Sequence, residues 1–284
     1  DIVWAEWLTS EQAKLLALRT AYLRDIRLVT REYREMTESE LQRTLGAVAR
    51  GDLSGVDLEV KRLAASDAAN RDRDAEALLN QAELDLNRVL GIDPSEQIDL
   101  IGPLAISLPT KTDAELFEQA VGSRADLSAL RDGVDSGRSA TNLARVIGYP
   151  LPSLSINAAR DTGNIRTIGP SLSFTLPLWN RGRGDVAIPR ASQAQLSAEY
   201  NARVESIRAD IADARTALDI ANAQKLEAQA ELGPLIPQAQ ASMRAANRGD
   251  ISLSAANATQ LTVLDKQIVV LGLARSEAEL LVAL

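Results

Sequence analysis

An internal repeat is the feature that most constrains how this chain can fold. The segment Arg50-Gly51-Asp52-Leu53-Ser54 returns 198 positions later as Arg248-Gly249-Asp250-Ile251-Ser252, where a long alanine-rich stretch again turns back on itself. Because repeated segments fold into repeated units, the two copies predict two long helical hairpins. At this spacing Asp1 is the counterpart of Glu199, and about 78 residues, 121–198, have no partner in the first copy. We therefore expect the chain to be amino-terminally incomplete, with a first helix and a first β-hairpin missing.

Apolar residues at spacings of three and four give both copies narrow helical stripes. One stripe runs from Leu15 to Met36, and another runs from Val204 to Ala221. Narrow stripes that continue over this length favour coiled-coil packing. Hydrophobic residues make up 45% of the chain but aromatic residues only 3%, a balance that suits closely packed helices.

Glycine and proline mark the expected ends of the helices. Gly91 is expected to end the first hairpin. Pro234 and Pro237 predict a break or an offset in the first helix of the second hairpin. The expected helices are residues 2–48, 56–90, 113–121, 125–147, 185–246 and 253–284.

Two segments alternate polar and apolar residues and predict a β-hairpin. The alternation is strict in 153–158 and in 171–176, and a polar turn at 161–166 separates them. Each arm can extend to about ten residues, the length that a tilted transmembrane strand requires. Such hairpins are more often parts of soluble sheets, but the sequence has no other strong strand to complete one. We therefore expect further copies of the chain to close the sheet, with Tyr149 and Trp179 in an aromatic girdle.

Composition excludes several classes of function. The net charge is −8 and the basic residues are scattered, which argues against nucleic-acid binding. The chain contains no Cys and no His, so thiol nucleophiles, imidazole bases and the usual transition-metal ligands are absent. Carboxylates are spread along the helices without a catalytic arrangement, and we expect no enzyme activity, no cofactor and no metal site. No run of 18 apolar residues predicts a transmembrane helix.

The two repeated turns are candidate functional tips. Gly51 and Gly249 are expected to supply positive φ, and Asp52 and Asp250 to cap the returning helices. The repeat itself explains the duplicated Arg-Gly-Asp tripeptide, so we infer no adhesion function from it. The tips are suited to docking another helical hairpin or to lining an aperture with charge. The candidate residues are Arg50, Gly51, Asp52, Ser54, Arg248, Gly249, Asp250 and Ser252.

Several short motifs are shared with one known family. Arg124-Ala125-Asp126-Leu127 is similar to the start of its second repeat, although Ala125 stands where the family usually has Pro. Leu90-Gly91 is similar to the end of its first repeat, and the segments 149–155 and 169–183 resemble the two ends of its β-hairpin. On these motifs the chain resembles the outer membrane efflux protein family, the TolC-like exit ducts of tripartite pumps. The short hairpin turn is most similar to the heavy-metal branch of that family.

The resemblance implies a mainly α-helical fold with a β-hairpin, in which two-repeat helical hairpins form an α-barrel and the strands join a transmembrane β-barrel. It implies a homotrimer in the bacterial outer membrane with a long periplasmic extension. Its partners would be outer-membrane lipid, a periplasmic adaptor of the membrane-fusion type and an inner-membrane transporter of the RND type. The expected organisation is a first-repeat helical hairpin at 1–91, an equatorial connection at 92–122, the first helix of the second repeat at 123–150, a β-hairpin at 151–178 and a second-repeat helical hairpin at 179–284.

The function implied by the resemblance is that of a passive exit duct for metal cations or small toxic compounds. Two alternatives remain open from the residues alone: a periplasmic adaptor, and a soluble coiled-coil scaffold. The strand residues expected to face the lumen are Ser153, Ser155, Asn157, Ser171, Ser173 and Thr175. Those expected to face lipid or to form the girdle are Tyr149, Leu154, Ile156, Leu172, Phe174, Leu176 and Trp179.

Overall fold

Two compact units divide the chain in the computed structural model. The smaller unit holds Glu115–Ala209 together with the first four residues, and the larger unit holds Ala5–Ala114 and Asp210–Leu284. The residues that the structure describes are 2–101, 110–147, 152–174 and 183–283.

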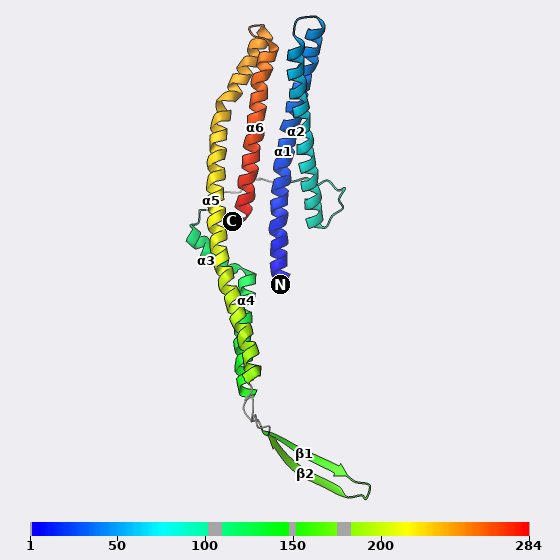
Figure 1. The fold of residues 1–284 in the computed structure, drawn as a ribbon, viewed down its shortest axis with the longest axis vertical. Coiled ribbons are helices and arrows are strands. Elements are labelled where there is room, and N and C mark those ends of the chain that lie inside the picture. The colour runs from blue at the N-terminus through cyan, green and yellow to red at the C-terminus, as the bar shows by residue number, and fades with distance from the viewer. Residues whose placement is uncertain (1, 102–109, 148–151, 175–182, 284) are drawn as a thin grey trace. The chain divides into compact units, whose positions relative to one another are not determined.

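The larger unit contains the two repeated helical hairpins except for residues 2–4 and 183–209, which belong to the smaller unit (Figure 1). The first hairpin consists of α1 (Ile2–Ala49) and α2 (Gly55–Leu90), and the second of α5 (Arg183–Arg248) and α6 (Leu253–Ala283). All of these bounds lie within two residues of the expected ones, so both predicted hairpins are confirmed. None of the described helices carries an apolar stretch sufficient to cross a bilayer.

Small side chains form much of the buried seam between these helices. On α2, Ala68, Ala75 and Ala82 recur every seven residues and are 1%, 5% and 3% exposed. A seven-residue repeat is the period of a coiled coil, and alanine at the seam lets neighbouring helices approach closely. The stripe predicted from Val204 to Ala221 contributes Ile207, Leu218 and Ala221 to the buried set, whereas in the stripe predicted from Leu15 to Met36 only Leu18 is buried. The larger apolar residues that are almost fully buried in this unit include Leu23, Leu86, Leu218 and Leu264.

Helix α5 corrects one expectation, because it is continuous from Arg183 to Arg248. The break expected at Pro234 and Pro237 is absent, and α5 instead curves between its yellow and orange parts in Figure 1. Each proline removes one backbone donor and crowds the carbonyl four residues earlier, which bends a helix. The i→i−4 bonds on either side are enough to keep the helix intact.

The smaller unit packs α4 (Ala125–Ile147) against the first part of α5, with most of α3 (Asp113–Ser123) in the same unit. The helices α4 and α5 approach closely at Gly137, where an added Cβ would lie 3.2 Å from the Cα of Gln193. Only glycine at position 137 permits this approach of the two helices without a shift of the neighbouring backbone. Elsewhere in this unit, Leu127 is fully buried.

The strands β1 (Pro152–Arg160) and β2 (Arg166–Phe174) form a two-stranded antiparallel hairpin in the same unit. Ser153 lies opposite Ser173 and Ser155 opposite Ser171, and the pairing continues without a bulge to the turn. The alternating pattern thus predicted both strands, and the structure adds their register.

Candidate functional site

The two tips close with the same backbone turn. The Asp52 N–H donates to the Ala47 carbonyl at 2.9 Å, and Asp250 makes the corresponding bond in the second tip at 2.9 Å. Gly51 and Gly249 have φ values of 82° and 80°. This left-handed conformation ends a helix in the Schellman motif and favours glycine. The role predicted for both glycines is confirmed, and the repeat is preserved down to its hydrogen bonds.

The tip carboxylates pair with arginine and do not cap the returning helices. Arg50 Nε donates to Asp52 at 2.9 Å, and Arg248 Nε donates to Asp250 at 2.8 Å. The capping role predicted for the two aspartates is therefore wrong, because the N-cap position falls two residues later in each tip. All four side chains are at least 55% exposed, so the pairs are open to solvent and to a partner.

Serine occupies the cap position in both tips. The Asp57 N–H donates to Ser54 Oγ at 3.3 Å, while the Ser54 N–H donates to Asp57 Oδ2 at 3.0 Å, completing a capping box. Hydrogen bonds from the Ser54 hydroxyl and N–H lower the pKa of Asp57. In the second tip the Ala255 N–H donates to Ser252 Oγ at 3.1 Å. The spacing of Ser54 and Asp57 was the sequence signal for this cap.

One face of the β-hairpin carries serine hydroxyls that bond to each other across the strands. The Oγ atoms of Ser153 and Ser173 lie 2.8 Å apart, and those of Ser155 and Ser171 lie 2.7 Å apart. Asn157 Nδ2 donates to Ser171 Oγ at 3.3 Å. The five predicted polar residues that the structure describes therefore share one face, where they form two hydrogen-bonded groups.

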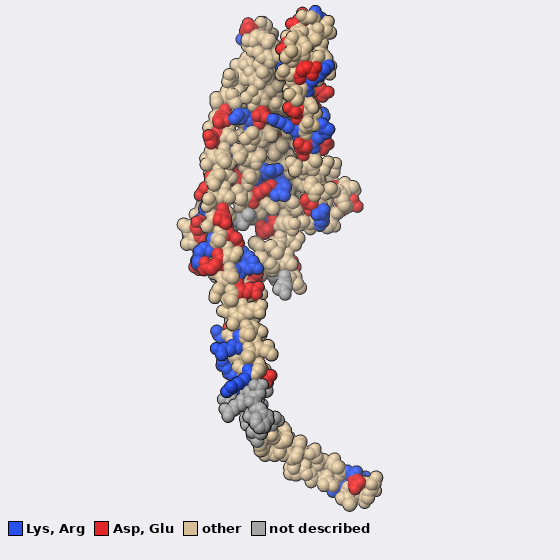
Figure 2. Space-filling view, viewed as in Figure 1, with Lys and Arg blue, Asp and Glu red and all other residues tan. Residues whose placement is uncertain are grey.

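The opposite face of the hairpin is apolar and exposed. Leu154, Ile156, Leu172 and Phe174 are between 57% and 74% exposed. Figure 2 shows that the charged residues of the hairpin gather at its turn and that the strands carry almost none. An exposed, uncharged face of this kind requires a partner or a lipid environment.

Sequence reasoning missed two members of this apolar face. Ile168 lies opposite Ala158, and Pro170 lies opposite Ile156, so both side chains are on the apolar side. Ile168 is 75% exposed. The signal was the register, because extending the alternation back from Leu172 includes both positions. The predicted residues Tyr149, Thr175, Leu176 and Trp179 lie outside the described residues.

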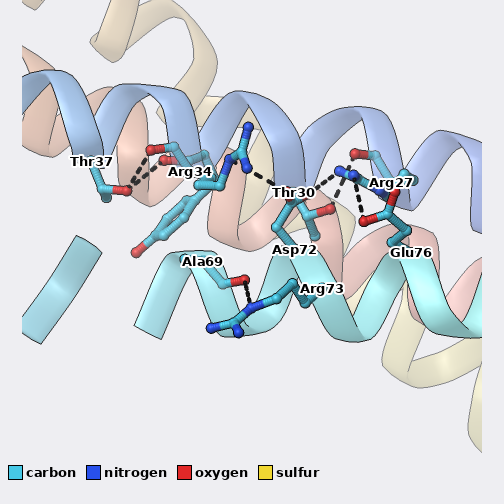
Figure 3. Close-up of polar contacts among 9 residues, drawn as sticks. Arg27, Thr30, Arg34, Thr37, Ala69, Asp72, Arg73 and Glu76 are labelled. Carbon is cyan, nitrogen blue, oxygen red and sulfur yellow. Dashed lines mark hydrogen bonds and ion pairs between the residues drawn. The ribbon is translucent and has the colours of Figure 1, made fainter. Parts of the chain in front are cut away.

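A buried carboxylate joins α1 to α2 within the first hairpin (Figure 3). The side chain of Asp72 is 2% exposed and accepts a hydrogen bond from Arg27 Nη1. Arg34 Nε lies 3.3 Å from Asp72 Oδ2, and Arg27 Nη2 lies 3.4 Å from Glu76 Oε2. Two arginines seven residues apart on α1, about two turns, thus neutralise one carboxylate of α2. The sequence contained no signal for this cluster, because it does not show which face of α2 meets α1.

A second buried carboxylate joins the two repeats. Asn257 Nδ2 on α6 donates to Glu40 Oε1 on α1 at 2.5 Å, and Ser254 Oγ donates to Glu40 Oε2 at 3.0 Å. Burial would raise the pKa of Glu40, but these hydrogen bonds and the charges of Lys61 and Arg43 outweigh burial and lower it. Glu40 is therefore an anion held between helices of different repeats.

Comparison with solved structures defines the class of this fold. The chain matches a membrane protein from Pseudomonas aeruginosa with a TM-score of 0.79 and 17% identity, over 98% of this chain and 67% of that one. It matches the CmeC outer membrane channel of Campylobacter jejuni with a TM-score of 0.74 and 14% identity, over 97% of this chain and 61% of that one. The chain therefore has the fold of TolC-like outer-membrane channels, as its mainly helical fold class predicted.

A curated relative agrees with this class. The chain is 28% identical over 225 residues to the cobalt-zinc-cadmium resistance protein CzcC of Cupriavidus metallidurans. The matched region covers 78% of this chain and 51% of CzcC. The chain thus spans about half the length of the curated relative that it matches. It matches no protein-family model. Similarity in sequence and in fold confirms the resemblance to outer membrane efflux proteins.

Proposed function

We propose that this chain forms part of an outer-membrane exit duct, a passive channel through which an efflux system releases its cargo. The observation that carries the proposal is the two-faced β-hairpin in a chain with two repeated helical hairpins and the fold of outer-membrane channels. A soluble scaffold has no need of a hairpin with an exposed apolar face. The proposed location is the bacterial outer membrane, with the helices in the periplasm.

The two faces of the hairpin suit the two environments of a membrane channel. The serine and asparagine face is proposed to line a water-filled lumen, and the face with Leu154, Ile156, Ile168, Leu172 and Phe174 to contact lipid. Hydrocarbon cannot satisfy the backbone groups of a free strand edge, so neighbouring strands must complete the sheet. In the proposed homotrimer, further strands come from other copies of the chain.

The tips are proposed to form the periplasmic end of the duct. Their charged pairs, Arg50 with Asp52 and Arg248 with Asp250, are exposed at the ends of the long helices. Exposed charged pairs at a hairpin tip suit contact with the tip of another helical hairpin, as expected of a periplasmic adaptor. An inner-membrane transporter would supply the energy, because an open bore performs no work by itself.

The proposed cargo is divalent metal cations, on the strength of the similarity to CzcC. The test compares a strain that lacks the full-length protein with one that regains it, on graded cobalt, zinc and cadmium. We expect loss of the protein to lower tolerance of these metals, and the purified protein to give ohmic channels in planar bilayers. Unchanged tolerance of all three metals contradicts the proposed cargo, and an absence of conductance contradicts the duct itself.

A further inference from the structure

The end of α4 and the start of α5 form a basic part of a chain that is acidic overall. Over residues 136–147 and 183–198, the charged residues are four arginines and a single acid, Asp185. All four arginines are exposed, and Figure 2 shows basic side chains grouped over this part of the two helices. We call them the basic patch: Arg138, Arg145, Arg183 and Arg190. Since the whole chain has a net charge of −8, this local excess of positive charge favours an anionic partner.

Arginine recurs every seven residues from Arg124 along α4, which places these side chains on one stripe of the helix. At the start of the stripe, Arg124 pairs with Asp126 at 2.8 Å. Arg131 Nη2 donates to the Tyr200 hydroxyl of α5 at 3.1 Å, and the Arg131 Cζ lies 5.5 Å from the centre of the tyrosine ring. These two guanidinium groups therefore have partners within the smaller unit.

The two arginines of the stripe that come next in the sequence are held less firmly. Arg138 lies 3.5 Å from Asp135, and the two side chains are 66% and 72% exposed. Arg145 Nη1 donates to the neutral side chain of Asn142 at 3.3 Å. An exposed ion pair of this kind contributes little stability, so an anion can replace it. The stripe therefore changes from arginines matched inside the protein to arginines available to a partner.

Helix α5 presents its two arginines beside an apolar surface. Arg183 and Arg190 are also seven residues apart, and both line an open hollow of about 540 Å³. The other residues that line this hollow are Val186, Ala187, Ala191 and Ala194. Guanidinium groups beside aliphatic side chains match a ligand that joins a phosphate to a hydrocarbon chain.

Packing of α4 against α5 brings the four arginines to two levels of one helix pair. The two helices approach each other at Gly137 and Gln193. Equal steps from this contact along the antiparallel helices put one arginine of each, Arg138 and Arg190, at about the same height. The other two arginines lie about 10 Å further along, toward the helix ends that lead to the strands. The basic patch is therefore a compact feature of the smaller unit.

Short connections join both helix ends to the β-hairpin. Arg145 lies seven residues before Pro152, where β1 begins, and Arg183 lies nine residues after Phe174, where β2 ends. In the proposed duct, strands of nine residues take up most of the hydrocarbon thickness, so the chain leaves each strand close to the lipid headgroups. A connection of seven residues spans at most about 25 Å, which keeps the basic patch near that layer.

We propose that the basic patch binds the phosphate groups of anionic phospholipid in the inner leaflet of the outer membrane. The inference rests on the proposed duct, which sets the hairpin in that membrane and the helices in the periplasm. Arginine suits this role because its guanidinium group donates two parallel hydrogen bonds to phosphate oxygens. Exposed aliphatic side chains near the arginines, Leu143, Val146 and Ile188, suit the boundary between headgroups and acyl chains. This contact fixes the depth at which the helices leave the bilayer.

Lipid preference in detergent tests the basic patch directly. The full-length protein, freed of lipid, is given equal amounts of phosphatidylglycerol and phosphatidylcholine, and the retained lipid is measured by mass spectrometry. We expect the wild type to retain at least roughly fivefold more phosphatidylglycerol, because each arginine near an anionic surface contributes about this factor. Replacing all four arginines with Gln should bring the ratio close to one, and replacing all four with Lys should preserve most of it. A wild-type ratio near one, or loss of the preference in the Lys variant, overturns the proposal.

A control variant removes the same amount of charge elsewhere. Arg62→Gln with Arg88→Gln on α2 removes two arginines whose side chains are 53% and 74% exposed. Its lipid ratio should equal that of the wild type, whereas Arg145→Gln with Arg183→Gln should lower the ratio. Equal effects of the two double variants overturn the proposal, because the response would then follow net charge alone. Inorganic phosphate should compete no better than chloride at the same ionic strength, and stronger competition overturns the assignment to lipid.

The outcomes separate this proposal from the proposed function. A protein that conducts and protects against metals but shows no lipid preference overturns the lipid-binding role and leaves the duct intact. A protein that has the preference but neither conducts nor protects supports the lipid-binding role and contradicts the duct. If the arginines face the bore instead, the variant with four Gln shifts the reversal potential in a salt gradient without changing the lipid ratio. That result also overturns the proposal.

Discussion

At the scale of the residue, buried carboxylates fix how the helices meet. Asp72 is nearly inaccessible and lies between two arginines of α1, so its charge is matched only while α1 and α2 stay in register. A slip by one turn would move the buried carboxylate away from both guanidinium groups. Buried ion pairs often add little net stability, but losing one partner is costly because the other charge remains buried.

Asp72→Asn tests this role with almost no change in shape. The variant leaves Arg27, whose side chain is 11% exposed, without its main counter-charge, and we expect the free energy of unfolding to fall by about 3 kcal/mol. Guanidinium unfolding followed by helical circular dichroism measures the change. Glu205→Gln is the matched control, because its partner Arg208 and Glu205 itself are 58% and 67% exposed and the pair should contribute less than about 1 kcal/mol. Equal losses in both variants would show that burial of Asp72 is not what matters.

The lowered pKa of Glu40 predicts how the stability of the contact between the repeats depends on pH. Its pKa in the folded protein lies below the usual 4.5 because hydrogen bonds from Asn257 and Ser254 outweigh the effect of burial. A carboxylate with a lowered pKa adds stability above its ordinary pKa, and that stability is lost as the pH falls through the folded value. We expect the wild type to lose more stability than Glu40→Gln between about pH 5 and pH 3. Parallel curves for the two proteins would rule out this source of acid sensitivity.

At the scale of the element, local signals such as glycine at helix ends and alternation of polar and apolar residues predicted where the helices and strands lie. Gly91 and the two tip glycines located helix ends, and strict alternation located both strands, because these signals act within a few residues. The continuity of α5 was missed, since whether two prolines break or only bend a helix depends on the packing around them. The partners of Asp72 and Glu40 were missed for a related reason. They lie in other helices, and no local pattern reports which helix faces meet.

The two faces of the hairpin predict opposite effects of arginine substitutions at neighbouring residues on insertion into lipid. Leu172→Arg puts a charge on the apolar face, where transfer to the bilayer midplane costs about 2–4 kcal/mol, so we expect poor insertion into outer-membrane lipid vesicles. Ser171→Arg puts the same side chain on the polar face and should insert nearly as well as the wild type. The fraction that resists urea extraction from the vesicles measures both. A reversed order of the two variants would mean that the faces are assigned the wrong way round.

At the scale of the whole molecule, the repeat provides two tips with the same turn and the same charged pair. Their glycine turns and serine caps do not involve the guanidinium groups or the tip carboxylates, so the charges can be removed without opening the turn. This separation allows a test of function at the tips that leaves the fold intact.

Replacing Arg248 and Asp250 with Ala should raise single-channel conductance in planar bilayers or weaken cross-linking to the adaptor. The reason is that the change removes charge from the proposed aperture while α5 and α6 still end as before. Arg208→Ala with Glu205→Ala is the control, because it removes an equally exposed pair far from the tip. If conductance and cross-linking both stay at the wild-type level, the tips have no role in gating or docking.

The paired serines of the hairpin have a consequence for traffic through a pore. In each pair one hydroxyl proton is already committed to the neighbouring oxygen, so two serines offer a single free donor. Along the proposed water-filled bore, such a wall is wettable, and it presents neutral hydroxyl oxygens instead of carboxylates to passing cations. Divalent cations prefer charged carboxylate ligands to neutral hydroxyl groups, so this face would hold the proposed cargo only weakly as it passes.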